Sequence, residues 1–356
     1  MTGVALFRLP YQHNCSLLSG EVTELPSVGA LSEHHGFVVA PFSPSFPVLL
    51  IHADRQQQYA GPHELTEALY DFKPQGQVCL STDDKSDYHA AFSDFHTALA
   101  NNHFQKLVLS RRVDIPKDDD VTPLELFRRA CERYPRMFIS LTYTPYSGLW
   151  LTATPEILLS GEGNRWHTMA LAGTMPYADQ VSWSDKNIQE QRYVATYIAK
   201  TLEQFTDDCQ EEGPKTARAG HLAHLRSDFT FSLHDDTSIG QLLDALHPTP
   251  AVCGLPKHES YHFILQHEHH DRSYYSGFMG PLSVNGQTNL FVTLRCMQIF
   301  EHSYRLYAGG GLLKDSIEEL EWQETETKLD TMRHIIYNDN VNGNDNGNDN
   351  DNGNHV

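Results

Sequence analysis

The sequence predicts an α+β protein in which strands and helices mix without strict alternation. Short apolar or β-branched runs bounded by polar and turn residues, which are typical of strands, recur along the chain. Longer segments between them repeat their apolar residues with the helical period of 3.6. With 356 residues, the chain is long enough for one large domain or two ordinary ones, and its core needs no disulfides for stability.

The first half of the chain supplies most of these elements. The initial residues hold short apolar runs at 36–42 and 46–53, which we expect to be strands separated by turns. The segment 87–104 has helical spacing of its aromatic and leucine residues. The following predicted elements are strands at 105–115, 137–144, 148–155 and 156–161, and helices at 122–134 and 184–205.

The stretch 246–260, LHPTPAVCGLPKHES, cannot form a regular helix because it holds three prolines, each of which fixes φ and removes a backbone donor. Proline also pushes the residue before it toward an extended conformation. We therefore expect His247 and Thr249 in a stiff, extended segment, with Gly254 free to turn the chain sharply.

Beyond this stretch we expect strands at 289–300 and 304–311 and a last helix at 317–336. The remaining segment, 338–356, is a low-complexity run of Asn, Asp and Gly. Such a composition cannot bury a core, so we expect this tail to be disordered.

Composition excludes several classes of function. The formal net charge of −20 argues against a nucleic-acid-binding protein. No apolar run is long enough for a membrane span, and the first residues do not resemble a signal peptide, so we expect a cytoplasmic protein. The six cysteines are far apart and form no C-x-x-C pair, which favours free thiols over a disulfide framework or a zinc site.

The last helix carries charges on the face that should be buried. When successive residues are placed about 100° apart, three charged residues share an arc with three apolar ones. A solvent-exposed i,i+4 Glu–Lys pair is the alternative explanation, but the apolar neighbours argue against it. The apolar residues are Ile317, Met332 and Ile335, and the charged ones are Glu321, Glu324 and Lys328.

The helix at 184–205 shows a milder version of this pattern. Glu190 lies at the edge of its apolar arc, where a solvated carboxylate would be an equally good explanation. Inward carboxylates on two helices are what an oxygen-preferring cation such as Mg²⁺ requires. The two helices together therefore suggest a magnesium site.

Four more positions could carry chemistry. Lys106 stands in a strand among Leu and Val, either as a guard against edge pairing or as a buried lysine whose neutral amine serves as a base. Glu156 ends one strand and precedes ILL, an apolar setting that raises the pKa of a carboxyl and suits an acid. Arg295, expected within a strand, could bind a carboxylate through two hydrogen bonds. The glycines 309–311 could present backbone N–H groups to an anion, or simply form a turn.

Taken together, these segments resemble the chorismate-utilising enzyme family, and within it the isochorismate synthases. The resemblance covers residues from about 100 to 335 and rests on eight motifs in the family's order. It implies large, mostly antiparallel sheets with helices packed outside. The motifs are KLVLSRR (106–112), ATPEILL (153–159), LAGT (171–174), KNIQEQ (186–191), LHPTPAVCGLP (246–256), VTLR (292–295), LYAGGGL (306–312) and EWQETETKL (321–329).

Two motifs indicate the branch of the family. Members that use ammonia typically carry Gln where this chain has Lys106, so the resemblance implies no glutamine amidotransferase subunit. Salicylate synthases keep the lysine but differ from the HPTPA sequence. Gln191 departs from the pattern, because many relatives have His there. A salicylate synthase, or a non-catalytic chorismate-binding subunit, remains an alternative.

The resemblance implies Mg²⁺-dependent isomerisation of chorismate to isochorismate, which would feed menaquinone or siderophore synthesis. Lys106 would be the general base that activates water for attack at ring C2. Glu156 would be the general acid that protonates the departing C4 hydroxyl. Glu190 and Glu324 would hold Mg²⁺, with Glu321 in support.

The other implied site residues contact the substrate. Arg295 and the amides of Gly309–Gly311 would take the enolpyruvyl carboxylate, and the proline-rich stretch would form a rigid wall against the ring. The resemblance divides the chain into an N-terminal part at 1–84, a catalytic region at 85–337 and the tail at 338–356. The expected substrate-binding residues are Gly173, Thr174, His247, Thr249, Arg295, Tyr307, Gly309, Gly310, Gly311 and Lys328.

Overall fold

The computed structural model describes residues 1–66, 74, 76, 84–117, 120–178, 181–220, 222–234 and 238–338. The tail expected to be disordered lies outside the described residues, apart from Asn338. Within the described ranges, no helix combines the length and the apolar character needed to cross a bilayer.

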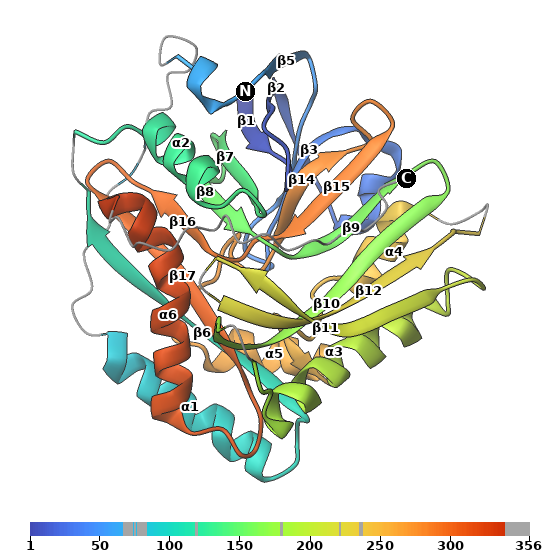
Figure 1. Ribbon diagram of the computed structural model, residues 1–356, viewed down its shortest axis with the longest axis vertical. Helices are drawn as coiled ribbons and strands as arrows, with labels where there is room; N and C mark the ends of the chain where they lie inside the picture. The colour runs from blue at the N-terminus through green and yellow to red at the C-terminus, as the bar shows by residue number, and fades with distance from the viewer. Residues whose placement is uncertain are drawn as a thin grey trace.

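The described residues form 17 strands, and every pairing between them is antiparallel. They make two extended sheets that share the long strand β2 (Figure 1). The first sheet runs β5 (Arg55–Tyr59), β2 (Cys15–Leu25), β1 (Thr2–Arg8), β7 (Phe138–Thr144), β8 (Gly148–Thr154), β16 (Cys296–Ile299), β17 (Ser303–Leu312), β6 (Lys106–Pro116) and β13 (Gly254–Leu255). The second runs from β2 through β4 (Val48–Ile51), β3 (Gly36–Ala40), β14 (Phe278–Leu282), β15 (Gln287–Val292), β9 (Ile157–Glu162), β10 (Arg165–Pro176) and β12 (Leu222–Phe231) to β11 (Gln210–Ala219).

Helices pack on the outside of these sheets (Figure 1). Helices α1 and α5 lie against β6, α6 lies along β17, and α3 covers β10 and β12. This arrangement confirms the predicted α+β class with mostly antiparallel sheets and external helices. The helices are α1 (Asp84–Ala100), α2 (Pro123–Arg133), α3 (Asp185–Leu202), α4 (Ile239–Leu246), α5 (Lys257–His267) and α6 (Glu318–Tyr337), with 3₁₀ turns at Val28–Glu33 and Pro62–Glu64.

Local sequence signals explain where several helices begin. The hydroxyl of Ser184 accepts a hydrogen bond from the backbone N–H of Asn187 and so caps α3. Helix α6 has no side-chain cap, but three acidic residues occupy its first turn, where the helix dipole favours negative charge. Ile317 is the N-cap residue and is 61% exposed, so its assignment to the buried face of this helix was wrong. Ile317 precedes the helix, so the spacing of about 100° between helical residues does not determine where its side chain points.

The proline-rich stretch connects α4 to β13. His247 is extended, as predicted, with φ −92° and ψ 139°. The chain then turns at Thr249, whose carbonyl accepts hydrogen bonds from the N–H groups of Val252 and Cys253. The expected role of Gly254 as the turn was wrong. It pairs with β6, and a Cβ there would lie 2.4 Å from the Lys106 carbonyl oxygen, so close approach of two backbones requires glycine.

The single strand predicted at 289–300 is two strands, because the chain leaves the second sheet after β15 and enters the first sheet at β16. The crossing occupies residues 293–295 and places Arg295 outside both strands, with φ +20°. The prediction of Arg295 as a strand residue was therefore wrong. Its position between the two sheets directs its side chain into the space that they enclose.

Candidate active site

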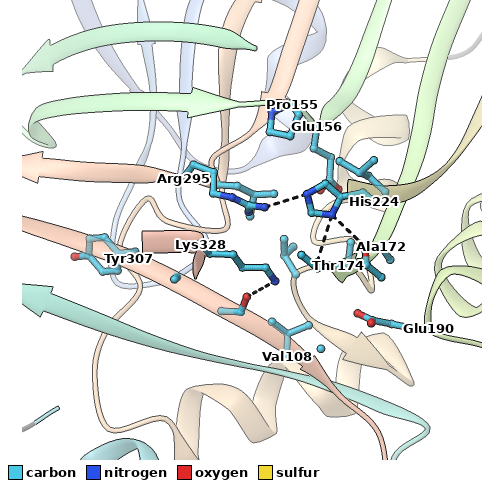
Figure 2. Close-up of a pocket in the computed structure, with 18 of the residues that line it drawn as sticks. Val108, Pro155, Glu156, Ala172, Thr174, Glu190, His224, Arg295, Tyr307 and Lys328 are labelled. Atoms are coloured by element: carbon cyan, nitrogen blue, oxygen red, sulfur yellow. Dashed lines mark hydrogen bonds between the residues drawn. The ribbon is translucent and has the colours of Figure 1, made fainter. Parts of the chain in front are cut away.

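A pocket lies where the two sheets approach each other (Figure 2). The space among its lining atoms amounts to about 590 Å³, a figure that includes open solvent. Strands β6 and β17 of the first sheet and β10 and β12 of the second line it, together with α3, α6 and the loop before β13. The pocket brings together nine of the predicted site residues, whereas Lys106, Gly310, Glu321, Glu324, His247 and Thr249 are not part of its lining. The nine are Glu156, Gly173, Thr174, Glu190, Arg295, Tyr307, Gly309, Gly311 and Lys328.

Each of the three carboxylates predicted to hold a metal lies against a lysine. The distances between nitrogen and oxygen are 3.1 Å for the pair on β6 and α3 and 2.6 Å for the pair within α6. The three positive and three negative charges balance within one small region. This balance explains how the protein tolerates three carboxylates near its interior. The pairs are Lys106–Glu190, Lys328–Glu324 and Lys186–Glu321.

The carboxylates converge on two glycines of β17. A Cβ on Gly310 would lie 3.6 Å from Glu321 Oε2 and 3.7 Å from Glu324 Oε1. A Cβ on Gly311 would lie 2.1 Å from Glu190 Oε1. Glu321 Oε2 is buried and has no hydrogen-bond partner among the described residues. The carboxylate oxygens thus surround a space that exists because positions 310 and 311 have no Cβ atom. Carboxylate oxygens are the ligands that suit Mg²⁺.

These carboxylates do not form a preformed metal centre. Within the part of the chain that the structure describes, no three His, Cys, Asp or Glu side chains stand close enough to hold an ion together. The lysine pairs account for this, because each carboxylate directs one oxygen to an ammonium group. Binding of a divalent cation would therefore require small side-chain movements of Glu190 and Glu324.

Lys106 is completely buried. Strand β6 is paired with β13 on one side and β17 on the other, so the alternative of a lysine that guards a sheet edge is excluded. Its ammonium does not itself line the pocket, but it reaches the pocket at Glu190. Despite this ion pair, its Nζ makes no well-directed hydrogen bond within the described ranges, so its donors remain available.

Glu156 follows β8 and is 2% exposed. Burial raises the pKa of its carboxyl to about 8, against the opposing charges of Lys106, Arg295 and Lys328. The carboxyl is therefore mostly protonated at neutral pH, which is the state that a general acid requires. In Figure 2 Glu156 lies near the top and Glu190 at the lower right, with Lys328 to the left of both.

His224, on β12, is a pocket residue that sequence reasoning missed. Its Nε2 lies 3.2 Å from the guanidinium of Arg295, and its Nδ1 lies 3.1 Å from the carbonyl oxygen of Gly173 and 3.3 Å from Thr174 Oγ1 (Figure 2). Since arginine can only donate, Nε2 accepts and Nδ1–H donates to the Gly173 carbonyl. The neutral imidazole thus orients Arg295, a residue predicted to bind substrate.

His247 and Thr249 are not among the residues that line this pocket. The His247 ring packs edge-on against Phe278, and burial lowers its pKa to about 3, so it is neutral. Ala251 and Val252 face the pocket instead, because the turn at Thr249 rotates the chain before β13. The proline-rich stretch therefore lines the pocket, but through residues other than those predicted.

Glycines 309–311 belong to β17 and pair with β6 along their length, so they are not a turn, and Gly309 and Gly311 line the pocket. Tyr307 stacks between Trp150 and Tyr275, with ring centroids 5.6 and 5.4 Å apart. Both Tyr307 and Tyr275 line the pocket. Tyr275 was missed because the segment before β14 carries no periodic pattern.

A family model described as "Chorismate binding enzyme" matches residues 51–337, which is most of the chain. The chain belongs to the chorismate-binding enzyme family. The resemblance inferred from the eight motifs is thereby confirmed, and the match extends further toward the N-terminus than the motifs did.

Curated members of the family with similar sequences are isochorismate synthases. Isochorismate synthase DhbC of Bacillus subtilis is 29% identical over 306 residues, which cover 81% of this chain and 73% of that protein. Isochorismate synthase EntC of Escherichia coli is 28% identical over 247 residues, which cover 66% of this chain and 63% of EntC.

The solved structure of MenF, the menaquinone-specific isochorismate synthase of Escherichia coli, superposes with a TM-score of 0.78 at 23% identity. The superposition covers 94% of this chain and 88% of MenF. At this level of identity the likeness supports the chorismate-binding enzyme fold.

Proposed function

We propose that this protein is an isochorismate synthase, which converts chorismate to isochorismate by adding water at C2 and removing the C4 hydroxyl. The observation that carries the proposal is the buried carboxyl of Glu156, whose pKa burial raises to about 8, in the same pocket that Lys106 reaches at Glu190. This reaction removes a proton from one oxygen and supplies a proton to another, so it needs a base and an acid that act on one substrate.

Lys106 serves as the base in this proposal. In its neutral form, the amine takes a proton from the water that attacks C2. Lys106 Nζ is completely buried beside Glu190, 3.1 Å from its Oε1, and makes no well-directed hydrogen bond in the described part of the chain, so this proposal needs the substrate water to reach it from the pocket at Glu190. Glu156 then donates its proton to the departing C4 hydroxyl, which leaves as water. After the reaction Lys106 is protonated and Glu156 is ionised. Proton exchange with solvent then restores the starting state of both side chains.

The cationic side chains orient the dianionic substrate. Arg295, which contacts His224, would bind one carboxylate, and Lys328, which also donates to the Gly309 carbonyl at 2.8 Å, would bind the other. Tyr307, whose ring is stacked between Trp150 and Tyr275, makes its part of the pocket lining rigid. The pocket thus combines charge for affinity with a rigid lining for orientation.

We further propose that the enzyme uses Mg²⁺, held by Glu190 and Glu324 with support from Glu321. When bound, the ion would neutralise the ring carboxylate of chorismate and hold it in place. The product fits a supply role in menaquinone or siderophore synthesis.

The direct test is incubation of the protein with chorismate and Mg²⁺, followed by chromatographic separation of the products. We expect isochorismate without any need for glutamine, ammonia or a second subunit, and we expect loss of activity in excess EDTA. Salicylate and free pyruvate as main enzymatic products would show a salicylate synthase instead. Full activity in EDTA would contradict the metal requirement.

The pH profile tests the acid. Because burial raises the pKa of Glu156 to about 8, the proton that it must donate is lost as pH rises through that value. We expect kcat to fall above about pH 8, measured from about pH 6 to 10 with Mg²⁺ saturating. Glu156→Gln should remove most of the activity at every pH in this range. A kcat that stays level to the alkaline end would contradict the assignment of Glu156 as the acid.

A further inference from the structure

An ion pair joins the two helices that carry the proposed metal carboxylates. Lys186, in the first turn of α3, binds Oε1 of Glu321, in the first turn of α6, although the two residues are 135 positions apart in the chain. Lys186 precedes Glu190 by one helical turn, and Glu321 precedes Glu324 by nearly one turn. The pair therefore lies beside both of the expected metal ligands.

This ion pair connects parts of the fold that otherwise belong to different layers. Helix α3 packs on β10 and β12 of the second sheet, whereas α6 packs on β17 of the first. The Lys186 ammonium also lies within electrostatic reach of Glu190 and Glu324. The contact therefore lies between the two helices that hold these carboxylates.

The orientation of Glu321 shows whether Lys186 supports the binding of a cation or competes with the cation for the carboxylate. Glu321 is 2% exposed, and Lys186 takes its Oε1, while Oε2 faces Gly310 without a hydrogen-bond partner in the described part of the chain. A lysine that competed with the metal would occupy the oxygen that faces the centre. Lys186 instead holds the opposite oxygen and leaves the inward one free.

We propose that Lys186 is a positioning residue, which braces α3 against α6 and presents Glu321 Oε2 to a divalent cation bound by Glu190 and Glu324. This inference rests on the proposed function, because that function supplies the cation. Lys186 touches neither the substrate nor the ion, and it acts through Glu321 and through the spacing of the helices. Partners of this kind typically change metal affinity by roughly 10- to 100-fold when they are removed.

The test compares the full chain with Lys186→Met, Lys186→Arg and Lys200→Met, in titrations with Mg²⁺ alone followed by calorimetry. Lys200 is an exposed lysine on the same helix and serves as the matched control. We expect Lys186→Met to weaken Mg²⁺ binding roughly tenfold, Lys186→Arg to restore most of it, and Lys200→Met to leave it unchanged. Unchanged binding by Lys186→Met would overturn the inference, and tighter binding would overturn it and identify Lys186 as a competitor for the carboxylates.

A second measurement does not depend on the ion. Amide hydrogen exchange of the metal-free proteins should be faster in the first turns of both α3 and α6 in Lys186→Met, while exchange in the core strands stays unchanged. If both turns of Lys186→Met exchanged at the rate of the parent, the proposed positioning role of Lys186 would be contradicted. If the parent binds no Mg²⁺ at all, the metal requirement of the proposed function fails together with this inference. If the parent binds Mg²⁺ and Lys186→Met binds it equally well, only this inference fails.

Discussion

Replacement of Lys106 with glutamine is expected to lower kcat for chorismate roughly 10²-fold or more, which is the usual scale for loss of a general base. Glutamine keeps the length and polarity of the side chain but cannot accept a proton from water. Strands β13 and β17 hold the backbone of β6 on both sides, so the substitution changes the side chain without freeing the strand.

The measurement is kcat and KM for Lys106→Gln, with chorismate binding in the presence of Mg²⁺ measured by calorimetry. We expect binding to survive, because Arg295 and Lys328 remain and Glu190 can accept a hydrogen bond from the new amide. Lys200→Gln, at an exposed position on α3, controls for the loss of a positive charge. A near-parental kcat would remove Lys106 from the mechanism.

The same variant tests which nucleophile the site selects. Members of the family that use ammonia typically carry Gln at this position. We therefore expect high ammonium to restore part of the turnover of Lys106→Gln and to give an aminated product, because ammonia is a better nucleophile than water that no base activates. Product analysis by mass spectrometry decides this. Rescue of water addition alone by ammonium would indicate that ammonium acts as an external base.

The sequence could predict those features of the site that depend on local periodicity. Glu321 and Lys328 fall on the apolar arc of α6, and the structure buries both. Glu190, at the edge of the apolar arc of α3, is also buried. A buried charged residue can be recognised in the sequence because it interrupts the apolar face of a helix. The helical period then predicts the direction of its side chain.

Features that depend on contacts between distant segments left no such signal. The His224–Arg295 contact joins positions 71 residues apart, and the Lys186–Glu321 pair joins positions 135 residues apart. A histidine among Leu and Ala in a strand usually fills a core, so His224 gave no reason to expect a role in the site. Lys186 lay within a recognised motif, but only the packing of α3 near α6 shows its partner.

The proline-rich stretch shows the limit of reasoning from backbone restriction. Proline determines φ and disfavours helix, and the structure has no helix from His247 to Pro256. It does not determine which side chains face the substrate, because that depends on the turn at Thr249 and on the pairing of β13 with β6. For this reason Ala251 and Val252, rather than His247 and Thr249, reach the pocket.

Substitution of Glu324 by glutamine is expected to abolish isochorismate formation while the fold remains intact. Glutamine has nearly the same shape, but its neutral amide is a poor substitute for a carboxylate ligand of Mg²⁺. The loss should appear as weak Mg²⁺ binding in calorimetry and as product below detection at millimolar Mg²⁺. Glu319→Gln, an exposed position on the same helix, should leave both unchanged.

The stability of the metal-free variant separates a ligand from a structural residue. Glu324 Oε1 accepts a hydrogen bond from Lys328 at 2.6 Å, and the Glu324 side chain is 21% exposed, so the pair is partly solvated. Loss of such a pair changes the free energy of unfolding by about 1 kcal/mol or less. Lys328 keeps its bond to the Gly309 carbonyl, which limits the cost further. If metal-free Glu324→Gln melted far below the metal-free parent, Glu324 would be a structural residue of the helix, and Mg²⁺ binding would need another protein oxygen.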